Sequence, residues 1–210
     1  MIRAVPLYTF LDHCNSSPLE KEVLECGAGV SSSFEPLLVR FYEGGYKTHG
    51  IEISNERLAA AQRYGEENGM ALDISKGDMR EIPFEDESMS FIFSYNTIFH
   101  MTKADIAIAM REIERVLKPG GLCFVNFLSV DDGSCGEGQQ LGKGEFVQDE
   151  AGGKTVHTYY ADNEPDVYFS NFDMLHKEKR NLERWFEGEK YSQAYIDYIA
   201  QKRAEPRNIE

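Results

Sequence analysis

Short apolar segments alternate with helical patterns from Lys21 to Leu128, and this alternation limits the fold more than any other feature. The apolar segments have the length of strands and cover residues 23–25, 48–53, 72–75, 89–95 and 122–128. Parallel neighbours in a sheet need crossover connections, usually helices, because a tight turn cannot join them. The alternation therefore predicts an α/β fold with a mostly parallel sheet.

The helices between these strands carry recognisable start and stop signals. A serine cluster at 31–33 is suited to cap a helix whose apolar face includes Phe34 and Phe41, and Gly44 and Gly45 would end it. Ser54 would cap a helix over 55–68. Thr102, with Asp105 three residues later, forms a capping box for a helix that reaches Leu117.

The last third of the chain is less regular. Residues 131–144 contain five glycines without periodicity, which predicts a long loop. An extended segment at 156–160 and a short helix at 164–169 follow. Residues 172–186 and 189–201 predict a hairpin, although 191–203 fit a helix equally well.

Composition and charge narrow the function classes. A length of 210 residues with 41% hydrophobic residues predicts a single domain, 1–210, with a sizeable core. The net charge of −14 disfavours nucleic acid and membrane surfaces as partners. The four cysteines form no C-x-x-C pair and no zinc-finger spacing with histidine, so we expect no metal, reduced thiols and a cytoplasmic location.

A glycine turn with acidic neighbours is the strongest chemical signal. Residues 25–29 read Glu-Cys-Gly-Ala-Gly at the end of the first expected strand, where glycines let a ligand approach the backbone and a following helix offers free N–H groups. Alone, this pattern also fits a structural turn. Glu52 ends the second expected strand and can accept hydrogen bonds from ribose hydroxyls, so the spacing favours a nucleoside ligand.

The acids also bear on which nucleoside cofactor binds. A nicotinamide dehydrogenase needs a third glycine where this chain has Ser32, and its diphosphate would meet Glu25. Glu25 therefore favours a cationic ligand. Asp78, in a Gly-Asp-Met segment after the third strand, is either a loop-capping residue or an acceptor for an exocyclic amine such as adenine N6.

Four segments in this order resemble the motifs of class I S-adenosylmethionine-dependent methyltransferases. They read VLECGAG at 23–29, GIEIS at 50–54, GDM at 77–79 and RVLKPGG at 115–121. The resemblance covers about residues 20–128 and is greatest to the small bacterial and archaeal proteins of the type 11 group. It implies a Rossmann-like, doubly wound sheet of seven strands with a C-terminal antiparallel hairpin, a cofactor-binding core at 20–128 and an acceptor-side insert at about 129–161.

The resemblance also implies roles for individual residues. The glycine turn and Asn96 would face the methionine part of S-adenosyl-L-methionine, Glu52 the ribose, and Asp78 with Met79 the adenine. The chain departs from the family at Ser31, where many relatives have glycine, and at Asn96, which lacks the following prolines of base-methylating and glutamine-methylating enzymes. The full cofactor-binding set is Glu25, Cys26, Gly27, Ala28, Gly29, Glu52, Ile53, Asp78, Met79, Tyr95 and Asn96.

Two histidines are candidates for the acceptor side. His100 follows the fourth strand and His157 lies in the insert; each is either a structural histidine or a base that removes a proton from the acceptor. Tyr8, Tyr159 and Tyr160 could line an aromatic lid. We therefore expect a methyltransferase for a small-molecule acceptor, with the insert and the amino-terminal segment closing over it.

Two other function classes stay open on the sequence alone: a non-catalytic cofactor-binding or partner-binding protein, and a nicotinamide-dependent oxidoreductase. The acceptor atom and the oligomeric state, including a homodimer, are not determined by the sequence.

Overall fold

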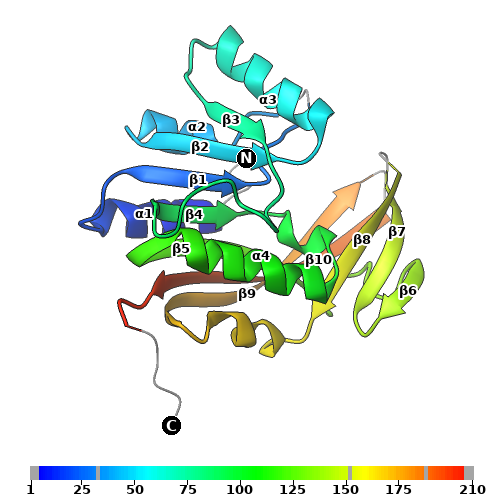
Figure 1. The fold of residues 1–210 in the computed structure, drawn as a ribbon. Coiled ribbons are helices and arrows are strands. Elements are labelled where there is room, and N and C mark those ends of the chain that lie inside the picture. Colours follow the sequence, from blue (N-terminus) through cyan, green and yellow to red (C-terminus); the bar gives the residue numbers. More distant parts are fainter. Residues whose placement is uncertain (1–4, 32–33, 151–152, 187–188, 206–210) are drawn as a thin grey trace.

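The structure is a computed structural model and describes residues 5–31, 34–150, 153–186 and 189–205. Its main sheet has the strand order β3-β2-β1-β4-β5-β10-β9 (Figure 1). The first five strands are parallel, and β10 is antiparallel to both β5 and β9. The seven strands are β1 (Glu22–Cys26), β2 (Lys47–Glu52), β3 (Asp73–Lys76), β4 (Met89–Ser94), β5 (Leu117–Ser129), β9 (Phe172–Phe186) and β10 (Glu189–Lys202).

Helices cover both faces of this sheet, as the alternation of the sequence predicts. The helical elements are α1 (Val5–Ser16), α2 (Leu38–Glu43), α3 (Asn55–Glu67), α4 (Lys103–Val116) and the 3-10 helices η1 (Ile98–His100) and η2 (Glu164–Phe169). Successive strand residues face opposite layers. In β1, Leu24 belongs to the core under α4, and Val23 belongs to the core under α1 and α2. Figure 1 shows α4 crossing the face of the sheet opposite to α1 and α2.

The amino-terminal segment forms a helix that the sequence pattern did not predict. Pro6 lies in the first turn of α1, a position that tolerates proline because its missing N–H has no partner there in any case. Phe10 is fully buried, and its ring lies 5.8 to 6.2 Å from the rings of Phe41, Phe93 and Phe124. This packing anchors α1 on the sheet.

The insert contains three strands where the sequence predicted mainly a loop. They are β6 (Gln139–Gly142), β7 (Glu145–Glu150) and β8 (Gly153–Tyr160), and they raise the total among the described residues from the expected seven to ten. The prediction of an irregular 131–144 was thus wrong for the residues of β6. β6–β7–β8 form an antiparallel unit that projects from the main sheet (Figure 1).

The length of β5 determines where this unit attaches. β4 ends its pairing with β5 at Ser94, opposite Val125, whereas β5 continues to Ser129. β8 pairs in parallel with this extension, with Leu128 opposite Tyr159 and Ser129 opposite Tyr160. β8 therefore lies beyond the carboxyl end of β4, at the edge where parallel α/β sheets bind ligands.

Most of the other expected elements are confirmed, with two shifted boundaries. The Ser54 and Thr102 caps are formed, each accepting a hydrogen bond from a backbone N–H three residues later, and the 172–201 hairpin is present. α2 begins only at Leu38, because Pro36 disfavours helical backbone at the residue before it; Ser32 and Ser33 lie outside the described residues. α4 ends at Val116, since Leu117 already pairs with Met89. No helix in the described part of the chain is long and apolar enough to cross a membrane.

Candidate functional site

The glycine turn after β1 is held by backbone hydrogen bonds and by close packing. The N–H groups of Gly27 and Ala28 both donate to the carbonyl of Ile51, at 2.9 and 3.0 Å. Gly27 has a φ of +90°, which favours glycine. A Cβ at Gly27 would collide with the side chain of Thr97, and one at Gly29 would collide with the carboxylate of Glu52. Both glycines are therefore required by this turn.

Glu25 brings a carboxylate into the interior beside this turn. It is 3% exposed, its Oε2 has no hydrogen-bond partner, and the backbone N–H of Leu38 is its main stabilising donor. Burial raises the pKa of Glu25 well above its usual value, and the nearby charge of Glu52 adds to the rise. No salt bridge reaches Glu25 from the described residues. The site therefore holds an uncompensated acid whose charge a cationic ligand would balance.

Glu52 is positioned by two backbone donors. Its Oε2 accepts from the N–H of Gly29 at 2.9 Å, and its Oε1 accepts from the N–H of Ser54 at 2.7 Å. A carboxylate oxygen has two lone pairs, so each oxygen keeps one for a ligand. The carboxylate is thus fixed at the end of β2, with acceptor capacity for two hydroxyl groups.

Asp78 takes part in an ion pair that the sequence pattern did not indicate. Arg80 Nη2 lies 2.6 Å from Asp78 Oδ2, and Arg80 Nη1 lies 3.2 Å from a carboxylate oxygen of Asp105. Arg80 lowers the pKa of Asp78 through its hydrogen bonds to that carboxylate. The Asp78 side chain remains 31% exposed, so it is ionised and accessible.

The remaining cofactor candidates divide into buried and exposed residues. The side chains of Cys26, Ala28 and Met79 pack in the two cores, so these residues can face a ligand mainly through their backbone. Ile53 is 58% exposed, an uncovered apolar side chain beside Glu52. The structure thus brings Glu25, Glu52 and the glycine turn together directly.

Asn96 lies two residues after the end of β4 and adopts a left-handed conformation, with a φ of +54°. Its N–H donates to Asn126 Oδ1, and its Oδ1 accepts from Asn126 Nδ2, both at 2.7 Å. The preceding Tyr95 packs its ring 5.8 Å from that of Phe124. Asn126 was not among the residues predicted from the sequence, although a single amide inside the apolar segment 122–128 is a signal that could have identified it.

The two histidine candidates lie together beyond β4. The rings of His100, in η1, and His157, in β8, meet edge to face with centroids 4.7 Å apart. His157 Nε2 lies 3.1 Å from Oε1 of Glu150, the last residue of β7. Burial and the neighbouring His157 lower the pKa of His100 to about 4, so its ring is neutral at pH 7. Nothing in the sequence pattern pointed to Glu150.

The histidine pair is linked to the glycine turn through Thr97. Thr97 packs against Gly27, and its carbonyl accepts the N–H of His100 at 3.0 Å. The charge of Arg57, at the start of α3, also contributes to the lowered pKa of His100. The acidic turn and the histidines therefore form adjacent parts of one edge of the sheet.

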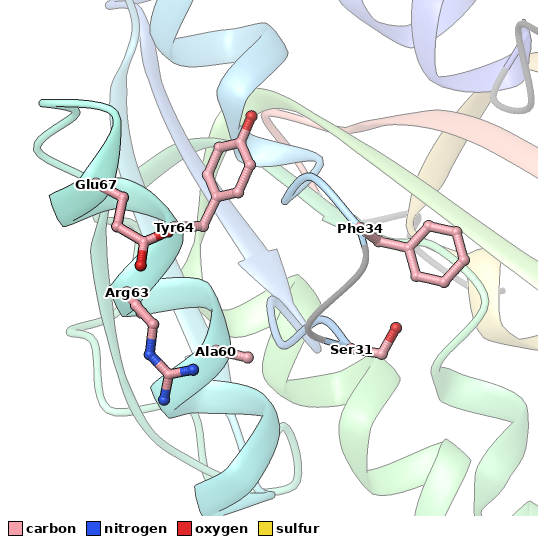
Figure 2. Close-up of a pocket in the computed structure, with 6 residues that line it drawn as sticks. All are labelled: Ser31, Phe34, Ala60, Arg63, Tyr64 and Glu67. Atoms are coloured by element: carbon pink, nitrogen blue, oxygen red, sulfur yellow. The ribbon is translucent and has the colours of Figure 1, made fainter.

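A separate small pocket lies between α3 and the segment before α2, with a volume of about 50 Å³. Its lining residues are Ser31, Phe34, Ala60, Arg63, Tyr64 and Glu67 (Figure 2). Ligand pockets usually measure about 300–1,000 Å³. This pocket is too small for a nucleoside, so we do not assign the cofactor to it.

The strand order and the glycine turn followed by an acid at the end of β2 define a class I methyltransferase fold. Residues 24–125, about half of the chain, match the family model described as "Methyltransferase domain". Residues 24–125 thus match a methyltransferase family, in agreement with the class I, S-adenosylmethionine-dependent type that the sequence motifs resemble.

Two curated relatives illustrate the range of this similarity. The chain is 29% identical over 104 residues to the YrhH protein of Bacillus subtilis, covering 50% of this chain and 56% of YrhH. It is 27% identical over 135 residues to a sarcosine/dimethylglycine N-methyltransferase of Aphanothece halophytica, covering 60% of this chain and 44% of that protein. The alignments thus span about half of these relatives.

Solved structures agree with the fold over nearly the whole chain. A SAM-dependent methyltransferase from Methanosarcina mazei superposes with a TM-score of 0.73 at 18% identity, covering 93% of this chain and 98% of that one. The PH0226 protein from Pyrococcus horikoshii superposes with a TM-score of 0.72 at 17% identity, covering 96% and 90%. At these identities the similarity establishes the fold.

Proposed function

We propose that this protein transfers the methyl group of S-adenosyl-L-methionine to a small-molecule acceptor. The buried carboxylate of Glu25 is the observation that carries the proposal. An ionised group without a counter-charge is costly in a protein interior. A sulfonium cofactor with a cationic amino group supplies the missing positive charge, whereas a nicotinamide dinucleotide would bring a diphosphate to the same acid.

The rest of the turn fits the other parts of the same cofactor. Glu52 has two free lone pairs for the ribose hydroxyls, and carboxylate acceptors make the stronger type of hydrogen bond. Ile53 offers an apolar surface to the adenine ring, and Asp78 an acceptor for its amine. Asn96, fixed by Asn126, would face the methionine part.

Methyl transfer from a sulfonium requires the protein mainly to position the two reactants. When bound, the sulfonium supplies an already activated methyl group. The chain's own residues then have to align the acceptor behind the methyl carbon and exclude water. β8 and η1 provide the wall beyond β4, and the neutral His100 or the Glu150-paired His157 can receive a proton from the acceptor.

Several finer features belong to the same proposal. The net charge of −14 supports a small molecule over nucleic acid as the acceptor. The four cysteines are free thiols, which supports a reducing, cytoplasmic location. A homodimer stays a prediction, which sedimentation velocity can test.

Calorimetric titration tests the cofactor assignment. S-adenosylmethionine and its demethylated product should both bind, and NAD should bind much more weakly. Tighter binding of NAD contradicts the proposal and favours the oxidoreductase.

A second measurement separates the enzyme from a non-catalytic binding protein. The chain is incubated with cofactor labelled in its methyl group and with metabolite fractions, and the label is followed into new products. Cofactor binding without label transfer to any fraction favours the non-catalytic protein.

A further inference from the structure

Two histidines and a glutamate from three separate elements meet beyond β4, and His100, His157 and Glu150 together form the histidine cluster. One ring nitrogen of each histidine and one carboxylate oxygen all lie within 4.8 Å of one another. His157 Nε2 and Glu150 Oε1 are already 3.1 Å apart. Ligand atoms that share a tetrahedral zinc ion at bonds of about 2.0–2.1 Å stand about 3.4 Å apart. Small side-chain rotations would bring the cluster to that geometry.

Unpaired ring nitrogens are a second, independent observation. The Nδ1 atoms of His100 and His157 are both buried and have no hydrogen-bond partner. His157 as a whole is only 8% exposed. A buried polar atom without a partner loses the hydrogen bond that water would have made. Each histidine offers one ring nitrogen to an ion, so a bound ion would compensate that loss in a histidine that binds it through Nδ1.

The donor set and its charge suit a transition-metal ion. Imidazole nitrogen and carboxylate oxygen together bind zinc in catalytic sites, and the combination of two histidines with one carboxylate also binds ferrous iron. Both kinds of site leave coordination positions open. Glu150 contributes the one negative charge of the cluster, while Arg57 is the nearby charge that opposes a cation.

We propose that the histidine cluster binds one divalent first-row transition-metal ion, of the zinc or ferrous class. The expectation of no metal rested only on cysteine spacing and zinc-finger patterns, which do not bear on a site of this kind. The two histidine ligands, His100 and His157, are 57 residues apart in the chain and are brought together because β8 pairs with the extension of β5.

The position of the ion indicates a class of acceptor, and this second step rests on the proposed function. Open coordination sites next to the glycine turn would bind a hydroxyl or thiol of the acceptor and lower its pKa, so that its proton leaves to solvent. The oxygen or sulfur lone pair then forms the bond to the methyl carbon. The bond from that carbon to the sulfonium breaks, and its electron pair stays on the cofactor sulfur.

Cobalt titration of the wild-type protein tests metal binding without any assay of activity. The chain is used without a histidine tag and is first treated with a chelator. We expect Co²⁺ to give the visible absorption bands of a low-coordinate site, saturating at one ion per chain and lost on addition of Zn²⁺. Zn²⁺ should also raise the midpoint of thermal unfolding, because a ligand that binds only the folded state stabilises it. Absence of both effects overturns the proposal.

Substitutions locate the site. Because even outer partners of metal ligands contribute about 10–100-fold to affinity, we expect His100→Ala and His157→Ala each to weaken Co²⁺ binding by more than about 100-fold. Glu150→Gln should weaken it by at least about tenfold. Glu150 is partly exposed, so this variant keeps the test usable if a histidine variant fails to fold. His176→Ala, a change at a histidine on β9 that pairs with Glu178, is the matched control and should bind Co²⁺ like the wild type. Wild-type affinity in all three cluster variants overturns the assignment.

The two proposals can fail separately. Metal binding in a protein that does not bind S-adenosylmethionine would contradict the proposed function and leave the metal site standing. Cofactor binding without metal binding would contradict the metal site and leave the proposed function standing. Once an acceptor is identified, full methyl transfer by the metal-free protein would overturn the role of the ion in binding that acceptor.

Discussion

The carboxyl edge of the sheet has two parts that are built differently. On the β1–β2 side, the site consists of a backbone turn and two carboxylates, and both required glycines are fixed by contacts with Ile51, Glu52 and Thr97. On the β8 side, it consists of imidazole rings from elements far apart in the sequence. A backbone cradle accepts few changes of residue type, whereas side chains on an inserted sheet can change without disturbing the core. This difference explains how one fold can keep its cofactor while its acceptor varies.

The largest expected effect concerns the β8 side. His157→Ala should lower kcat by about 100-fold or more, because it removes either a proton acceptor or a ligand of the proposed metal ion. Cofactor affinity should stay nearly unchanged, because His157 belongs to the acceptor side. Stopped assays with an identified acceptor, together with cofactor titrations, separate the two quantities. His176→Ala is the control, and unchanged turnover in His157→Ala would make His157 a structural residue.

The next effect concerns the β2 end. Glu52→Ala should weaken the cofactor by about tenfold to a few hundredfold, since hydrogen bonds to charged groups contribute about 1.5–3 kcal/mol. The exposed neighbour Glu56 provides a control, because Glu56→Ala removes the same charge from the start of α3. Titration with 2′-deoxy and 3′-deoxy cofactor analogues sharpens the test. The Glu52→Ala change should reduce the affinity for each deoxy analogue by a smaller factor than the affinity for the parent cofactor. Equal binding by folded mutant and wild type would refute the ribose assignment.

Asn126 joins the two parts of the site. Asn126→Ala leaves the Asn96 N–H without its acceptor and should lower the free energy of unfolding by about 1–3 kcal/mol. Asn96→Gly is the comparison variant, since glycine adopts the left-handed φ of this position without strain; it keeps the N–H bond to Asn126 Oδ1 and loses only the bond from Asn126 Nδ2, so it should destabilise the protein less than Asn126→Ala does. Urea denaturation measures both. If Asn126→Ala has the same free energy of unfolding as the wild type, the amide pair does not stabilise the end of β4.

Glu25 should make stability depend on pH in an unusual direction. Its pKa is raised in the folded state, so its contribution is complete below the ordinary value of 4.5 and is lost as pH rises through the folded-state pKa. Glu25→Gln removes the cost of burying the charge and should stabilise the cofactor-free protein by about 1–3 kcal/mol at pH 7. The advantage of the variant should grow from pH 4.5 upward. Urea denaturation over a pH series measures it, and an advantage independent of pH would show that the buried charge of Glu25 is not its cause.

Local signals in the sequence predicted the first part of the site well. The glycine turn and Glu52 each lie at the end of an expected strand, and the Ser54 cap depends on Arg57 three residues later, so local patterns are enough to identify them. The strands of the insert could not be predicted from local patterns. Residues 145–150 are mostly charged or half-buried and form a strand through pairing with β6 and β8. The meeting of His100 with His157 depends on the extension of β5 past β4, which no local pattern encodes. No sequence pattern identified α1 either, although Pro6 suits a first helical turn.

Glu25, buried beside the glycine turn, is the residue on which the cofactor assignment depends most. S-adenosylmethionine and its demethylated product differ by one methyl group and by the positive charge on sulfur, so the pair isolates that charge. Calorimetric titration of wild type and Glu25→Gln with both ligands is the direct measurement. We expect the substitution to weaken S-adenosylmethionine by about tenfold more than the product, equivalent to about 1.4 kcal/mol. Equal or no loss for the two ligands would contradict the claim that Glu25 balances the sulfonium.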